Sequence, residues 1–112
     1  MSIRVRYAPS PTGDPHVGNI RTAIWTWLHA RRYGGDFVLR LEDTDQSRAV
    51  EGSLERIENS LQWLGIDWDE GPNIDGNYGP YVQSERLERY QSAANKLLTD
   101  GHAYRCFCTP ED

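Results

Sequence analysis

Two different residue periods follow one another at the start of the chain. Ile3, Val5 and Tyr7 alternate with arginines, which is the period-two pattern of a short strand ending near Ala8. The next apolar positions recur at helical spacing, and paired glycines then supply a stop. These positions are Ile20, Ala23, Ile24, Trp27 and Leu28, followed by Gly34 and Gly35. The pattern predicts a strand, a loop and then an amphipathic helix.

A second strand and a second helix follow. Residues 37–41 form a nearly continuous apolar run, as expected for a strand buried on both faces of a parallel sheet. Residues 54–64 carry a second amphipathic pattern that stops at Gly65, and residues 66–68 form a candidate third strand. Strand, helix and strand within about 45 residues fit one right-handed crossover unit, so the predicted fold class is α/β.

The pattern in the last forty residues predicts a second structural unit, separate from the strand, helix and strand unit. Residues 71–80 are dense in turn-forming residues and mark a boundary. A third helix is predicted beyond it, capped by Ser84 and ending at Gly101, and residues 103–108 have the character of a strand. Residues 109–112 have the composition of a helix start, with Thr, Pro and two acids. We therefore expect this sequence to be a piece of a longer protein.

Composition describes one acidic globular domain. The chain has 112 residues, a formal net charge of -5, 38% apolar and 26% charged residues. An acidic chain is a poor general binder of polyanions, because counterion release needs clustered basic residues. Any contact with nucleic acid must use local basic pairs such as Arg4/Arg6 or Arg31/Arg32, or residues outside this sequence.

The cysteine spacing and the hydropathy bear on the cellular compartment in which the protein is found. Cys106 and Cys108 are separated by one residue, too close for a relaxed structural disulfide, which favours a reducing environment. The sequence contains no apolar segment suited to secretion or to crossing a membrane. We expect a cytoplasmic protein that does not associate with membranes.

Candidate chemistry gathers where the two predicted strands end. Ligands of open parallel sheets bind beyond the carboxyl ends of the strands, here at residues 10–18 and 42–45. His16 at a helix start could donate to a phosphate, although a histidine there is more often only a polar helix-start residue. Neither a phosphate loop with its Lys nor a dinucleotide motif is present. The carboxylates in residues 42–45 could bind Mg²⁺, or could form a solvated strand end.

Three ordered segments carry a family resemblance. The string Arg-Tyr-Ala-Pro-Ser-Pro-Thr-Gly-Asp-Pro-His-Val-Gly-Asn at residues 6–19 closely resembles the first signature of glutamyl-tRNA synthetases, class I ligases whose generic form reads His-Ile-Gly-His. Residues 40–45 and 79–86 resemble further family segments in the expected order, and the resemblance covers essentially the whole chain. Asn19 departs from the second His of the generic signature.

The resemblance implies a fold and a reaction. Residues 1–83 would be the first half of a Rossmann-type catalytic domain, and residues 84–112 would begin an inserted domain that receives the acceptor end of tRNA. The reaction would activate glutamate with ATP and Mg²⁺ and then transfer it to tRNA-Glu. The Lys-Met-Ser-Lys-Ser-like second signature is absent from the sequence. We therefore expect this piece alone to be inactive or very weak.

The resemblance also assigns residues to two adjoining sites. In the glutamate site, Arg6 would meet a substrate carboxylate, while Ser10 and Glu42 would hold the amino acid backbone, with Glu42 opposing the ammonium. The ATP site would be lined by Ala8, Thr12, His16 and Gly18. His16 would be the catalytic residue, and Gly18 would allow the adenosine to approach closely.

Other assignments stay open. Cys106 and Cys108 resemble half of the zinc site of some synthetases of this family, whose remaining ligands would come from later sequence. One alternative function is the tRNA-independent paralogue that attaches glutamate to a modified anticodon base. Another is a non-catalytic nucleotide-binding or assembly module that self-associates through open strand edges. A glutaminyl enzyme is disfavoured, because residues 10–13 and 81–86 resemble the glutamyl branch.

Overall fold

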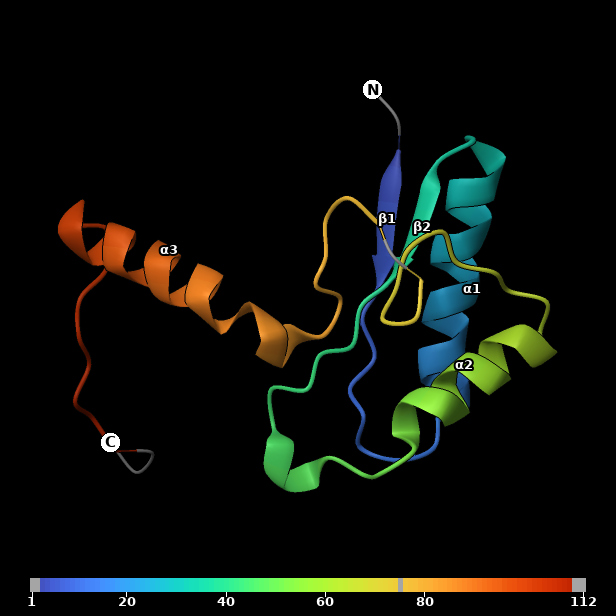
Figure 1. Ribbon diagram of the computed structural model, residues 1–112, viewed down its shortest axis with the longest axis horizontal. Coiled ribbons are helices and arrows are strands. Elements are labelled where there is room, and N and C mark those ends of the chain that lie inside the picture. Colours follow the sequence, from blue (N-terminus) through green and yellow to red (C-terminus); the bar gives the residue numbers. More distant parts are fainter. Residues whose placement is uncertain (1–2, 75, 110–112) are drawn as a thin grey trace.

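The computed structural model describes residues 3–74 and 76–109, apart from the side chain of Gln46. Mixed helices and strands follow one another along the chain (Figure 1). They are β1 (Arg4–Tyr7), α1 (Val17–Arg32), β2 (Asp36–Leu39), the 3-10 turn η1 (Gln46–Arg48), α2 (Ser53–Trp63), the 3-10 turn η2 (Gln83–Arg86) and α3 (Leu87–Thr99).

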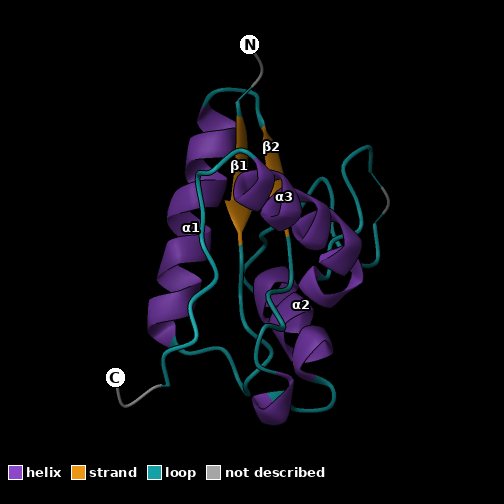
Figure 2. Cartoon of the chain, turned by 90° about the vertical axis from the view of Figure 1, so that its left-hand side faces the viewer, coloured by secondary structure: helices purple, strands orange, loops and turns teal. Residues whose placement is uncertain are grey.

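The predicted strand, helix and strand unit is confirmed. β1 and β2 pair in parallel, with Val5 opposite Phe37 and Tyr7 opposite Leu39. α1 packs on both strands and runs back along them (Figure 2). The turn into β2 is tight at Gly35, where a Cβ would overlap the backbone of Ile3.

The core lies between the sheet, α1 and α2. α1 contributes the small buried side chains of Ala23 and Ala30 to the core. The larger buried side chains come from β2 and α2. The largest fully buried apolar side chains are Phe37, Leu39, Ile57 and Leu61. Trp27 packs against this core, as its place on the apolar stripe predicts. α2 lies near the carboxyl ends of both strands (Figure 1), so it borders the edge where the candidate chemistry gathers.

The prediction of a third strand at residues 66–68 is wrong in position. Ile66 and Trp68 are buried in the core. The contact with β2 forms two residues after Trp68, as an isolated parallel bridge between Val38 and Glu70. The chain then leaves β2 and returns as a second isolated parallel bridge, between Leu41 and Val82. Two isolated bridges, one to β2 and one to the residue two positions beyond its end, therefore form where one strand was expected.

The predicted cap of the third helix is also wrong. A 3-10 turn occupies Gln83–Arg86, and α3 begins only at Leu87, without a side-chain cap. Ser84 instead donates its backbone N–H to Asp43 Oδ1 at 2.9 Å. The turn is thereby held against the segment that follows β2, and the helix starts one turn later than its sequence suggests.

Residues 103–108 do not form the predicted strand. They adopt no regular structure and are exposed throughout. Tyr104 and Phe107 are 86% and 88% exposed. A strand needs a hydrogen-bonding neighbour, and none lies beside this segment in the described part of the chain. The helix start predicted at residues 109–112 lies outside the described residues from Pro110 onward.

α3 stands apart from the rest of the fold. It projects away from the sheet (Figure 1), and its packing partner among the described elements is η2. The apolar side chains of Leu87, Tyr90 and Leu97 are all exposed. Within residues 3–74 and 76–109, no helix has both the length and the apolar character needed to cross a bilayer.

Candidate functional site

The loop between β1 and α1 is fastened to the segment that follows β2. The carbonyl oxygens of Pro9 and Pro11 accept hydrogen bonds from the backbone N–H groups of Glu42 and Val50, both at 2.9 Å. These bonds bring the carboxyl ends of the two parallel strands side by side, which is where ligands of such sheets bind. The loop residues and Glu42 therefore share one edge of the sheet, as the sequence predicts.

His16 begins α1 in a defined orientation. Its ring Nδ1 accepts a hydrogen bond from the backbone N–H of Gly18 at 3.1 Å, and its carbonyl accepts one from Ile20 at 3.1 Å. An accepting Nδ1 carries no proton, so the ring proton of neutral His16 is on Nε2, which is free to donate outward. Asp14, two residues earlier, forms an ion pair with Arg56 of α2 at 2.7 Å. The loop before the helix is thereby tied to α2.

Gly18 has a second role beside the one suggested by the resemblance. A Cβ at this position would lie 3.0 Å from Cε1 and 3.1 Å from Nδ1 of His16. A side chain at this position would therefore press on the histidine ring and displace it slightly. The backbone N–H of residue 18 orients the His16 ring, and the absence of a Cβ at Gly18 leaves room for the ring.

Two arginines share one carboxylate oxygen at the strand ends. Arg6 NH1 donates to Glu42 Oε1 at 2.6 Å, and Arg40 Nε donates to the same oxygen at 2.8 Å. The NH2 nitrogen of Arg40 also lies 2.6 Å from Glu42 Oε1. Two guanidinium charges and one carboxylate leave this cluster with one excess positive charge. Such a cluster can receive a ligand that carries both carboxylates and an ammonium.

Four of the predicted residues line one hollow of about 350 Å³. It lies where β1 passes into the loop and meets the first turns of α1. Its full lining is Arg6, Tyr7, Ala8, Pro9, Ser10, Gly18, Asn19 and Thr22. The structure thus brings Arg6, Ala8, Ser10 and Gly18 together, and Glu42 reaches them through its ion pair with Arg6. Thr12 and His16 do not border this hollow.

His16 borders a separate hollow of about 430 Å³ between the start of α1 and α2. Its other walls are mostly apolar, and Trp63 of α2 is 85% exposed there. The complete lining is Pro15, His16, Val17, Ile20, Asn59, Ser60, Trp63 and Leu64. Gly18 lines the first hollow and His16 the second, and the hydrogen bond between these two residues links them.

Sequence reasoning missed a polar cluster on β1. The guanidinium of Arg4 and the hydroxyl of Tyr81 both donate to the carboxylate of Glu70. The hydrogen bond from Arg4 lowers the pKa of Glu70, and burial raises the pKa of Tyr81. Arg4 and Arg6 alternate on one face of the strand, but nothing in the local pattern marks Glu70 as a partner. The cluster borders a further hollow of about 360 Å³, which Arg6 and Arg40 also line.

The acidic residues after β2 hold the backbone. Asp43 accepts the N–H of Ser84, as described above, and Asp45 accepts from Ser47 and Arg48. The hydrogen bond from the Ser47 hydroxyl is the main reason that the pKa of Asp45 is lowered. Within the described ranges, no three His, Cys, Asp or Glu side chains form a group that could hold a metal ion. These carboxylates therefore do not supply a protein cage for Mg²⁺.

Cys106 and Cys108 are exposed free thiols. Hydrogen bonds with Cys108, first from its backbone, lower the pKa of the Cys106 thiol. A structural zinc ion needs four ligands, and the part of the chain that the structure describes adds no third ligand to this pair. These two thiols alone do not complete a zinc site, and their role as half of one stays a prediction.

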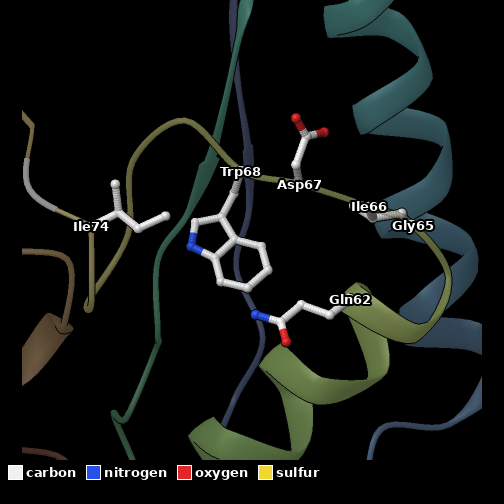
Figure 3. A pocket seen from close by; sticks show the side chains of 6 residues that line it. All are labelled: Gln62, Gly65, Ile66, Asp67, Trp68 and Ile74. Carbon is white, nitrogen blue, oxygen red and sulfur yellow. The ribbon is translucent and has the colours of Figure 1, made fainter.

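Another hollow, of about 340 Å³, lies away from the strand ends (Figure 3). The indole of Trp68 stands between Ile74 and Gln62, and the carboxylate of Asp67 points away from it. Asp67 instead accepts a hydrogen bond from Trp27 Nε1 at 2.7 Å. This hollow is mainly apolar and does not contain the charged groups that a reaction centre needs.

The fold and the paired strand-end residues define a class of protein. The family model described as tRNA synthetases class I (E and Q), catalytic domain, matches residues 2–112. The chain belongs to this family of class I tRNA synthetase catalytic domains. The resemblance read from the sequence motifs is therefore confirmed at the level of the family.

The relatives within this family share one activity by name. The glutamate–tRNA ligase of Dehalococcoides mccartyi is 62% identical over 109 residues, which cover 97% of this chain and 22% of the relative. The glutamate–tRNA ligase of Acidothermus cellulolyticus is 59% identical over 111 residues, which cover 99% and 22%. A crystal structure of a glutamate tRNA ligase from Elizabethkingia meningosepticum in complex with its amino acid has a TM-score of 0.93 and 49% identity, covering 99% of this chain and 22% of that one.

The chain is therefore short beside its relatives. It spans 22% of the length of each of the three proteins compared. The likeness covers the loop after β1, the strand ends and α3 together, because nearly all of this chain is matched. The activity of a whole relative therefore cannot be assigned directly to this shorter chain.

Proposed function

We propose that this chain carries the amino acid and phosphate half-site of a glutamate–tRNA ligase. In the proposed reaction, a carboxylate oxygen of glutamate attacks the α-phosphorus of ATP and pyrophosphate leaves. The glutamyl group then passes from the adenylate to the 3′ end of tRNA-Glu. The observation that carries the proposal is the Arg6 to Glu42 ion pair of 2.6 Å, set at the strand ends beside the loop that leads to His16.

The charges of the half-site suit glutamate. Arg6 would pair with a substrate carboxylate, Glu42 with the ammonium, and Ser10 would hold the amino acid backbone. Arg6, Arg40 and Glu42 together carry one excess positive charge, and glutamate at neutral pH carries one net negative charge. A neutral amide side chain would leave that positive charge without its partner. The proposed substrate is therefore the acid rather than the amide.

His16 would act on the phosphate. Its Nε2–H lies on the side of the ring away from Gly18 and would face an anion at the start of α1, where the helix dipole favours negative charge. A donor at this place stabilises the charge that develops on phosphate oxygens in the transition state. Ala8, Thr12 and Gly18 would line the rest of the ATP site. Mg²⁺ would be bound through the ATP phosphates and would neutralise their charge.

The remaining parts of the proposal concern the whole protein. Residues 1–83 would form the first half of a Rossmann-type domain, and residues 84–112 would begin the domain that meets the tRNA acceptor end. Catalysis would need the second half of the site, which we expect in the part of a whole ligase that this chain does not span. The chain alone should therefore bind ligands of the first step and turn over weakly or not at all. We place the activity in the cytoplasm, where thiols such as Cys106 and Cys108 stay reduced.

Calorimetric titration with a non-hydrolysable glutamyl-adenylate analogue tests the half-site. We expect saturable binding that weakens about tenfold or more in His16→Ala, since that change removes a hydrogen bond to a charged group. His102→Ala is the matched control, because His102 is exposed and lies beyond α3. The corresponding glutaminyl analogue should bind more weakly than the glutamyl one. Absence of binding, or equal loss in both histidine variants, would refute the proposed half-site.

A further inference from the structure

We propose that Arg40 is a positioning residue for Glu42. Its guanidinium keeps the Glu42 carboxylate in place when a bound amino acid draws Arg6 away from it. The proposal rests on the function proposed above, and it assigns to Arg40 a role that the sequence motifs do not suggest. Arg40 itself would not touch the substrate.

The geometry begins with the path of the chain after β2. Arg40 and Glu42 are two positions apart in extended backbone, so their side chains lie on the same face. Arg40 approaches Glu42 Oε1 with two nitrogens, Nε at 2.8 Å and NH2 at 2.6 Å. Arg6 reaches the same oxygen from β1 with NH1 alone, at 2.6 Å. One carboxylate oxygen thus has two arginine partners, of which Arg40 contributes two nitrogens and Arg6 contributes one.

Arg40 is also the better fixed of the two arginines. Its side chain is 23% exposed, whereas that of Arg6 is 45% exposed. Its backbone N–H donates to the carbonyl of Tyr7 at 3.0 Å, which binds this segment to the end of β1. The next residue, Leu41, is bonded on its other side to the carbonyl of Tyr81 at 2.9 Å. A ligand therefore reaches Arg6 more easily than Arg40.

Binding of an amino acid brings a second carboxylate to Arg6 and so favours an exchange of its partners. Arg6 donates to Glu42 through NH1 alone, so its Nε and NH2 nitrogens can still pair with a substrate carboxylate, which then competes with Glu42 for the same positive charge. If Arg6 were the sole partner of Glu42, binding would release that carboxylate to adopt other rotamers before the ammonium arrived. With Arg40 in place, Glu42 remains paired and oriented throughout the exchange. Preorganisation of this kind raises affinity, because less ordering is left to the binding step.

A double-mutant cycle in the 112-residue chain tests this role. The unsubstituted chain, Arg40→Gln, Glu42→Gln and the double variant are each titrated calorimetrically with L-glutamate and with the non-hydrolysable glutamyl-adenylate analogue. We expect Arg40→Gln to weaken binding about tenfold or more, and Arg40→Lys to fall between it and the unsubstituted chain. In the Glu42→Gln background, loss of Arg40 should have no further effect, because Arg40 acts through Glu42.

Matched controls separate positioning from loss of structure. Arg48→Gln removes an arginine that is 71% exposed and paired with Asp45, and it should leave binding unchanged. Thermal unfolding and amide spectra of each variant report whether the fold persists. If Arg40→Gln does not fold, Arg40→Lys and its combination with Glu42→Gln carry the same cycle.

The outcomes distinguish this proposal from the function on which it rests. Binding by the unsubstituted chain together with unchanged affinity in Arg40→Gln overturns the role of Arg40 alone. Independent, additive losses in the cycle overturn it too, since they would show that Arg40 acts without Glu42. Absence of binding by the unsubstituted chain overturns both proposals.

Discussion

The imidazole of His16 and the backbone of Gly18 are joined by a hydrogen bond of 3.1 Å within the first turn of α1. The acceptor is Nδ1, so this bond directs the other ring nitrogen outward. The contact is also tight, because a Cβ at Gly18 would lie 3.0 Å from the ring. The two residues therefore act as one unit in which glycine sets the pose of the histidine.

Gly18→Ala should separate stability from binding. Alanine favours a helix over glycine by about 0.5–1 kcal/mol, so thermal stability should be maintained or rise slightly. The His16 ring must shift, and affinity for the glutamyl-adenylate analogue should fall severalfold. Ring resonances of His16 in nuclear magnetic resonance spectra would report the shift directly. Arg21→Ala, on the exposed side of the same helix, is the control, and unchanged His16 resonances in Gly18→Ala would contradict the prediction.

Glu70 should make folding sensitive to acid. The hydrogen bond from Arg4 lowers the pKa of this buried carboxyl below its unfolded value of about 4.3. A carboxyl whose pKa is lower in the folded state adds stability above the unfolded pKa, and that stability is lost as pH falls through the folded pKa. Glu70→Gln should therefore be less stable at pH 7, by about 1–3 kcal/mol, with the difference shrinking toward pH 3.

Denaturant unfolding of both proteins across that pH range measures the Glu70 contribution. Other carboxyls, including Asp45 and Asp67, also have lowered pKa values, so the parent curve alone would not isolate it. Subtracting the free energy of unfolding of Glu70→Gln from that of the parent at each pH cancels the contribution of these other carboxyls. Glu55→Gln, exposed on α2, is the control. A stability difference that stays constant from pH 7 to pH 3 would rule out the linkage.

Asp69 should stabilise the junction of α1 and β2 in two separable ways. Its Oδ2 accepts the backbone N–H of Phe37 at 2.7 Å and the Arg31 guanidinium at 2.8 Å. Asp69→Ala removes both bonds and should cost about 1–3 kcal/mol in the free energy of unfolding. Asp69→Asn can still accept from Phe37 and should cost less, because only the partly exposed ion pair is weakened. Chemical denaturation orders the two variants, and equal losses would mean that the bond to Phe37 contributes nothing.

β1, α1, β2 and α2 could be predicted from the sequence because their causes are local. The alternation around Val5, the apolar stripe that includes Trp27 and the stop at Gly65 each act within a few residues. The structure after Trp68 could not be predicted, because the backbone partners of β2 and of the residues just beyond it lie far along the chain. Val38 pairs with Glu70, and Leu41, just beyond β2, pairs with Val82. No local residue pattern indicates either pairing.

The candidate site shows the same limit. The meeting of Arg6 and Glu42 follows from the rule that parallel strands bring their carboxyl ends to one edge. The partner of Arg4 does not follow from any such rule, because Glu70 lies 66 positions away. Residues 103–108 fail for a related reason, since strand character in a sequence cannot supply the missing neighbour. Pairing that follows from parallel strand order was therefore predictable, and pairing that depends on the path of a later loop was not.

α3 gives a last prediction about motion. The helix has 13 residues, it has no side-chain cap and none of its side chains is buried. Helices of that length are marginal in water unless an apolar face packs on something, because nucleation is costly. Amide hydrogens of residues 91–99 should therefore exchange much faster than those in the middle of α1, when followed by mass spectrometry in dilute solution.

Concentration separates the intrinsic behaviour of α3 from association between copies. If the exposed side chains of Leu87, Tyr90 and Leu97 cover one another between chains, protection of α3 should rise with protein concentration, and sedimentation should show larger species. Leu97→Lys should remove that rise without changing exchange in α1. Protection in α3 that equals that of α1 at every dilution would contradict the prediction, because it would mean that this helix is stable without a partner.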